Sequence, residues 1–127
     1  MSIQTIQQKR ARHALQKVRE VVGQDQQFKK EYKSYAAALP AMIHTNGLGQ
    51  AAAFYQSKGG THLVLYQLLS GWLCGENQPF ADQTDLLEGI TRSDMQTYRL
   101  AQAEAQALLE WVKQFAKAYL ADEEKKG

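Results

Sequence analysis

The side chains that most often carry chemistry are few in this 127-residue chain and lie far apart in sequence. Its three histidines, His13, His44 and His62, show neither HxxH nor HExxH spacing, so no two of them lie one helical turn apart as a zinc site requires. The single cysteine, Cys74, excludes an internal disulfide and a two-cysteine zinc site. The chain also lacks GxSxG, a P-loop and a paired-carboxylate motif. We therefore expect no enzyme, no catalytic residue, no metal site and no cofactor.

One histidine has a functional alternative. Histidine-phosphotransfer domains are helical bundles of about this size, and His44-Thr45-Asn46-Gly47 resembles their exposed histidine followed by small residues and glycine. The lysine that usually follows the histidine is missing here. A histidine phosphotransfer function therefore stays as an alternative to a simple surface histidine at a helix end.

Two glycines, Gly47 and Gly49, begin the segment that follows. Free backbone N–H groups at a helix start can hold an anion, and glycine lets a phosphate or a second backbone approach closely. The more common use of such glycines is a tight turn that lets two helices pack, and both interpretations are open at this point.

Basic side chains are the most informative group. The first 60 residues contain nine of the 15 Lys and Arg but only three of the 13 Asp and Glu, although the net charge is only +2. Lysine attracts phosphates without regard to base sequence, and arginine adds directional contacts. The residues we expect to bind nucleic acid are Arg10, Arg12, Lys17, Lys29, Lys30, Lys33 and Lys58.

Three basic residues on the last predicted helix, Arg99, Lys113 and Lys117, are second choices because acidic residues surround them. A basic helix face is also compatible with an ordinary solvated surface, or with a helical DNA-binding regulator. The latter would prefer one duplex sequence, whereas backbone binding would be weak per molecule and steeply dependent on salt.

Helical periodicity positions these side chains on a series of helices. Apolar spacing predicts helices over residues 3–22, 26–39, 48–56 and 62–73, and a last one of about 28 residues that begins after Thr91-Arg92-Ser93-Asp94. We expect Pro40 to end the second helix and Thr61 to cap the fourth. Residues 75–84 are expected to form a loop and residues 82–88 at most a short helix.

The predicted fold is all-α: one compact helical bundle of five to six helices over residues 1–121, with a long C-terminal helix and a flexible charged tail at 122–127. No apolar run approaches the roughly 20 residues of a membrane span, and the first twenty residues lack a secretory h-region. We therefore expect a soluble, cytoplasmic protein. Its core is expected to unite the aromatic residues Phe28, Tyr35, Phe54, Trp72, Tyr98, Trp111 and Phe115.

Two ordered segments resemble a known family. Residues 39–54 (LPAMIHTNGLGQAAAF), with Lys58 after them and Tyr32 and Tyr35 before, are similar to the signature segment of the small helical subunit of the type III-B CRISPR (Cmr) RNA-targeting effector complex. Tyr98-Arg99 and residues 111–116 (WVKQFA) fit the distal part of the same pattern. The resemblance extends from about residue 10 to residue 120.

This resemblance implies a non-catalytic role within a ribonucleoprotein for antiviral defence. Copies of such subunits stack as a minor filament beside the backbone subunits that hold the crRNA, and the two filaments together enclose the guide–target RNA duplex. The implied partners are therefore the backbone subunits, the large polymerase-like subunit, further copies of the chain, crRNA and target RNA. The family supplies no catalytic motif, so the expected RNA contacts rest on charge alone.

Overall fold

The structure is a computed structural model that describes residues 4–121. Within this range the chain forms five helices and no strand: α1 (Ile6–Val21), α2 (Gln26–Lys58), α3 (Gly60–Leu73), α4 (Leu86–Arg92) and α5 (Met95–Tyr119). The all-α prediction and the long C-terminal helix are confirmed. The expected tail at 122–127 lies outside the described residues.

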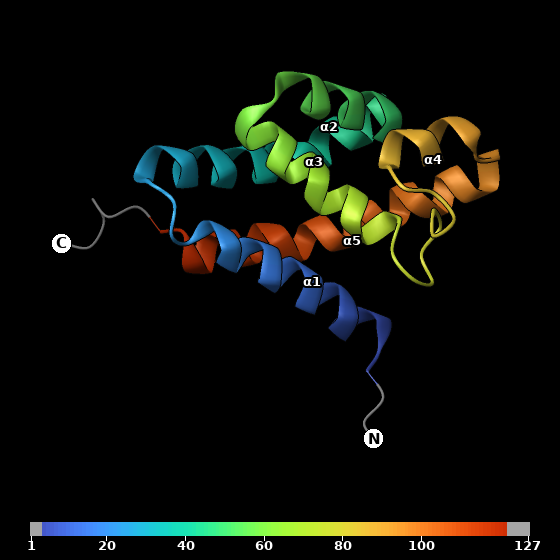
Figure 1. Cartoon of the computed structure of the whole chain (residues 1–127). Coiled ribbons are helices and arrows are strands. Elements are labelled where there is room, and N and C mark those ends of the chain that lie inside the picture. The colour runs from blue at the N-terminus through green and yellow to red at the C-terminus, as the bar shows by residue number, and fades with distance from the viewer. Residues whose placement is uncertain (1–3, 122–127) are drawn as a thin grey trace.

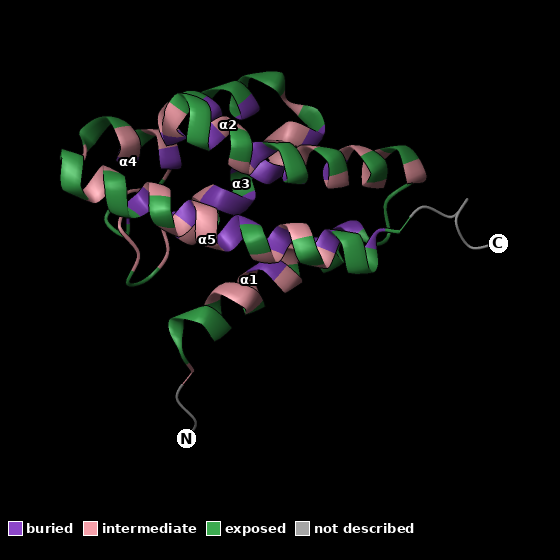
Figure 2. Cartoon of the chain, turned by 180° about the vertical axis from the view of Figure 1, so that it is seen from behind, coloured by how far each residue is buried: buried purple, intermediate pink, exposed green. Residues whose placement is uncertain are grey.

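Helix α5 runs through the middle of the bundle, between α1 and α2 (Figures 1 and 2). The most extensive contacts are those of α2 with α3 and of α5 with both α1 and α2. Helix α4 covers the end of the bundle where α5 begins (Figure 1). The C-terminal end of α5 lies at the opposite end, beside the connection between α1 and α2.

Three helices begin at the side-chain caps that stabilise free N–H groups in a first turn. Thr5 and Gln8 form a capping box on α1, and the side chain of Asp25 accepts from the N–H of Phe28 on α2. Asp94 accepts from the N–H of Thr97, so the predicted start of the last helix is confirmed.

The predicted Thr61 cap is wrong. Helix α3 begins at Gly60, and its N-cap is Gly59, whose φ of 67° suits glycine. Thr61 lies inside the first turn, and its hydroxyl donates to the Glu31 carboxylate at 2.9 Å. This bond fixes the start of α3 against the first half of α2.

The predicted end of a helix at Pro40 is also wrong, because α2 continues through it. Proline removes one backbone hydrogen bond, at a cost of about 3 kcal/mol or more. Leu39 and Ile43 on either side are fully buried, and the Pro40 carbonyl accepts from Nε2 of Gln106 at 2.9 Å. Packing against α5 therefore keeps the segment helical.

A break lies at Gly47, immediately before the predicted helix at 48–56. Gly47 has φ 85° and ψ 158° inside α2 and divides it into two segments. The first free N–H groups of the second segment donate to α5: Leu48 to Oε1 of Gln102 and Gly49 to the Tyr98 hydroxyl, each at 2.9 Å. These N–H groups are therefore not open to an anion, and the glycines permit close helix packing instead.

The core prediction is only partly correct. Phe54 is 43% exposed, and the other six expected aromatics are partly buried around the core instead of forming it. The aromatics buried at its centre are Tyr32, Tyr55, Tyr66 and Phe80. Figure 2 shows the buried positions facing inward along every long helix. Apolar spacing predicted which face of each helix is buried, but not which residue of that face is buried most completely.

Candidate nucleic-acid interface

Three of the expected RNA-binding residues share one side of α2. Lys29, Lys30 and Lys33 lie in the first turns after the Asp25 cap, within roughly 100° of each other around the helix axis. Tyr32 and Ala36, on the adjoining side of the helix, are completely buried and fix the orientation of this segment. Lys30 is exposed, whereas Lys29 and Lys33, which lie closer to the buried side, are half-buried.

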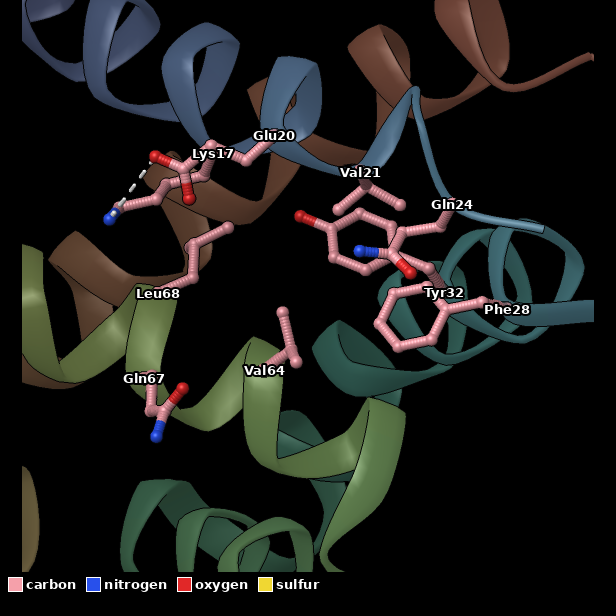
Figure 3. A pocket seen from close by; sticks show the side chains of 9 residues that line it. All are labelled: Lys17, Glu20, Val21, Gln24, Phe28, Tyr32, Val64, Gln67 and Leu68. Atoms are coloured by element: carbon pink, nitrogen blue, oxygen red, sulfur yellow. Dashed lines mark ion pairs between the residues drawn. The ribbon is translucent and has the colours of Figure 1, made fainter.

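Two sequence-distant lysines lie around the same turns. The Thr61–Glu31 hydrogen bond joins the start of α3 to the turn that carries Lys30, which brings in Lys58 from the end of α2. Lys17 of α1 lines the pocket between α1, α2 and α3, and Phe28, the residue before Lys29, lies at the opposite edge of that pocket (Figure 3). We refer to the five residues at this end of the bundle as the lysine surface: Lys17, Lys29, Lys30, Lys33 and Lys58.

Arg10 is not part of this surface. Its Nε lies 2.5 Å and its Nη2 2.9 Å from the Glu104 carboxylate, and the two side chains are only 12% and 15% exposed. The Trp72 indole N–H donates to the same carboxylate at 2.8 Å. Burial raises the pKa of Glu104, but hydrogen bonds from Arg10 and Trp72 outweigh it and leave the pKa below its usual value. Arg10 therefore acts as an internal counterion in this structure.

His13 completes this internal group. A ring nitrogen lies 3.0 Å from the Leu68 carbonyl oxygen, and its ring centroid is 5.3 Å from that of Trp72. Burial lowers the pKa of His13. We call Arg10, His13, Trp72 and Glu104 the polar cluster. Sequence reasoning missed it because only the i, i+3 spacing of Arg10 and His13 was visible, with nothing to indicate Trp72 or Glu104.

The remaining candidate cations lie elsewhere. Arg12 is exposed on α1 and donates to Oε1 of Gln4 at 2.6 Å. Arg99 lies near the beginning of α5, where it lines a shallow hollow that also includes the exposed His44. Lys113 and Lys117 lie toward the C-terminal end of α5, which is the end of the bundle that carries the lysine surface (Figure 1).

A pocket of about 250 Å³ separates α1, α2 and α3 next to the lysine surface (Figure 3). Its edge carries Lys17 and Glu20, whose charged atoms are 3.8 Å apart. The Tyr32 hydroxyl reaches between α1 and α3 and has no hydrogen-bond partner within the described residues. Burial raises the pKa of Tyr32 well above its ordinary value. The residues that line the pocket are Lys17, Glu20, Val21, Gln24, Phe28, Tyr32, Val64, Gln67 and Leu68.

Two kinds of feature are absent from the part of the chain that the structure describes. Among residues 4–121, no group of three or more His, Cys, Asp or Glu side chains is arranged to hold a metal ion. Over the same range, every helix is too short or too polar to cross a bilayer.

Comparison with known proteins identifies the family. The profile of the family described as CRISPR-associated protein (Cas_Cmr5) matches residues 6–119. The chain is 32% identical over 111 residues to the CRISPR system Cmr subunit Cmr5 of Thermus thermophilus, covering 87% of this chain and 91% of the relative. It also matches the crystal structure of a CRISPR-associated Cmr5 family protein from the same organism, with a TM-score of 0.77 and 30% identity over 91% of this chain and 98% of the other.

These findings confirm the expected resemblance, and membership of this family makes the chain a small subunit of a Cmr complex. The match includes both the segment around Gly47 and the C-terminal helix. The chain belongs to the Cmr5 family, the small helical subunit of type III-B CRISPR complexes.

Proposed function

We propose that the chain is a non-catalytic small subunit of a cytoplasmic Cmr ribonucleoprotein, in which the lysine surface contacts the backbone of the crRNA–target RNA duplex. The observation that carries this proposal is the group of three lysines on the first turns of α2, with Lys58 and Lys17 on segments that pack around these turns. Ammonium groups at a solvated surface bind phosphates without reading bases. Such binding suits a subunit that must accept any guide sequence.

The opposite end of the bundle differs in charge. Residues 75–99, which include α4 and the start of α5, contain five acidic side chains and two arginines, of which Arg92 pairs with Glu88 at 3.0 Å. The acidic side chains are Glu76, Asp82, Asp85, Glu88 and Asp94.

Copies that repeat one head-to-tail contact form an open filament. In this proposal the acidic end takes part in the contact with a neighbouring subunit, and the lysine surface stays outside it and free for RNA. The same contact would repeat the lysine surface along the RNA, so that weak contacts from single copies add together.

The test uses the assembled complex, since one copy offers few phosphate contacts. Lys29, Lys30 and Lys33 are replaced together by alanine, and a matched variant replaces all three by arginine. We expect the alanine variant to enter the complex and to bind target RNA at least about tenfold more weakly, because three phosphate contacts are lost. The arginine variant keeps the charge and should stay close to wild type. Equal RNA affinity of the alanine variant and wild type would contradict the proposal.

A further inference from the structure

A group of aromatic rings lies where the second segment of α2 turns into α3. The His62 ring stacks on Tyr35, with centroids 3.8 Å apart and an interplanar angle of 20°. It meets Tyr55 edge-on at 4.8 Å and Phe54 edge-on at 6.0 Å. His62 thus forms the centre of an aromatic group built from two helices.

Three of these rings are held in place by the fold. Tyr55 is 2% exposed, and its hydroxyl donates to the Tyr35 carbonyl at 2.8 Å, which ties the two segments of α2 together. Burial, followed by the charge of Lys58, lowers the pKa of His62, so its ring is an uncharged aromatic surface at neutral pH. This part of the group is a rigid support.

Phe54 is different, because its side chain is 43% exposed and contributes little to the core. Its neighbours in the second segment of α2, Ala51, Ala52 and Tyr55, are almost completely buried and fix the helix on which it lies. The exposed ring is therefore held at a fixed position by packing to which it does not itself contribute.

A cation accompanies the exposed ring. Nζ of Lys58, one helical turn further along α2, lies 5.6 Å from the Phe54 centroid. Glu31 is the nearby acid, and both of its carboxylate oxygens are engaged, one by Thr61 and one by Gln27. Hydrogen bonds from these neutral groups leave Glu31 ionised, so it remains a negative charge near His62. The charged group over the Phe54 ring is the Lys58 ammonium, which also belongs to the lysine surface.

An exposed aromatic ring beside a cation is the arrangement with which proteins bind unpaired nucleotides: the base stacks on the ring and the cation reaches the phosphate. Bases inside a duplex are already stacked on one another and cannot use such a ring. A protein partner would also cover Phe54, but the adjoining positive charge favours a polyanion.

We propose that Phe54 and Lys58, supported from behind by His62, form a stacking site for one unpaired RNA base. The site rests on the proposed function, because it requires RNA to reach the lysine surface. It extends that function by adding contact with a base at a break or at an end of the duplex.

The experiment uses the assembled complex and a target RNA that carries 5-iodouridine at single unpaired positions. Irradiation should cross-link one of these positions to the segment around Phe54, as read by mass spectrometry of the digested complex. Phe54→Leu keeps the apolar bulk but loses the aromatic face, so the cross-link should disappear and affinity for RNA with the unpaired base should fall roughly 5- to 100-fold. Phe54→Tyr should stay within about twofold of wild type.

Two controls separate this site from its context. Tyr119→Leu changes another exposed aromatic ring, at the C-terminal end of α5, that also has a cation near it, Arg19 at 5.8 Å from the ring centroid. This variant should bind RNA with the unpaired base like wild type, and Phe54→Leu should bind fully paired RNA like wild type. Normal RNA affinity of Phe54→Leu, together with weak binding by the triple alanine variant at Lys29, Lys30 and Lys33, would overturn the stacking site and leave the proposed function intact. Failure of Phe54→Leu to enter the complex, with RNA binding by the incorporated fraction unchanged, would overturn it as well and identify Phe54 as a protein contact.

Discussion

Two groups of cations on α1 and α2 have opposite roles. In the polar cluster, Arg10 is enclosed by Glu104 and neighbouring side chains and is only 12% exposed. At the lysine surface, Lys30 is open to solvent, and Lys17 has only a loose ion pair with Glu20, 3.8 Å long. Arg10 and these lysines carry the same positive charge. What separates them is the helix face on which each residue lies.

This difference predicts which property each region controls. A cation that shares a buried carboxylate contributes to folding, and its removal leaves a charge without a partner in a poorly hydrated site. A cation at the surface contributes little to folding but retains its long-range attraction for phosphates. Changes in the polar cluster should therefore alter stability, and changes at the lysine surface should alter RNA binding.

The largest effect is expected from Glu104→Ala. The substitution removes three hydrogen bonds and leaves Arg10 charged and mostly buried, so the free energy of unfolding should fall by about 2–4 kcal/mol. Urea denaturation of the isolated chain measures this. Glu110→Ala, at an exposed position on the same helix, should change the value by less than about 0.5 kcal/mol. Equal stabilities of the two variants would remove the distinction between the regions.

Gly47→Ala should be the next most damaging substitution. A side chain at φ 85° and ψ 158° is strained, and the new Cβ would lie 3.2 Å from the Tyr98 hydroxyl oxygen. We expect a loss of about 1–3 kcal/mol, again by urea denaturation. This variant also serves as a control, since it destabilises the bundle without changing any charge. In complexes that assemble normally it should bind RNA like wild type; weaker binding would mean that stability alone explains losses at other positions.

A smaller effect should follow from pH. The pKa of His13 is lowered in the folded chain, so the unfolded chain binds its proton first as the pH falls below about 6.5. The stability associated with neutral His13 is complete above that pH and is lost as the pH falls toward the folded pKa. His62 acts in the same direction.

Denaturation at several pH values between 5 and 8 tests this prediction. His13→Gln should flatten the decline toward low pH. A steeper decline in His13→Gln would show that His13 is charged inside the polar cluster.

The smallest effect is expected at the lysine surface itself. Lys17→Ala removes a 3.8 Å ion pair between side chains that are 38% and 65% exposed, so stability should change by less than about 0.5 kcal/mol in thermal or urea unfolding. A loss comparable with that of Glu104→Ala would mean that Lys17 is a structural residue, as Arg10 is.

Elements of the fold differ in how well they could be predicted from the sequence. Apolar periodicity and the Asp94 cap predicted α5 well because both signals are local. Pro40 was misinterpreted because its helix is maintained by a tertiary contact, the Gln106 hydrogen bond, together with the burial of Leu39 and Ile43. Neither the hydrogen bond nor the burial can be predicted from local helix propensity.

The candidate site was predicted in the same uneven way. The lysines at 29, 30 and 33 form a group because helix geometry alone places them together. Arg10 was expected at the surface, but it pairs with Glu104, which lies 94 residues away in sequence and could not be linked to it from spacing. Phe54 was expected in the core because its spacing matches an apolar face, but the burial of the adjacent Tyr55 turns it outward.

The most direct test of the account is the salt dependence of target-RNA binding by the assembled complex. The logarithm of the association constant is plotted against the logarithm of salt concentration for wild type, Glu104→Ala and the variant with alanine at Lys29, Lys30 and Lys33. Each lost phosphate contact should reduce the slope by roughly 0.7–0.9, so the triple variant should lose about 2–3 per copy in direct contact, while Glu104→Ala keeps the wild-type slope. Equal slopes for wild type and the triple variant would contradict the assignment of the lysine surface to RNA.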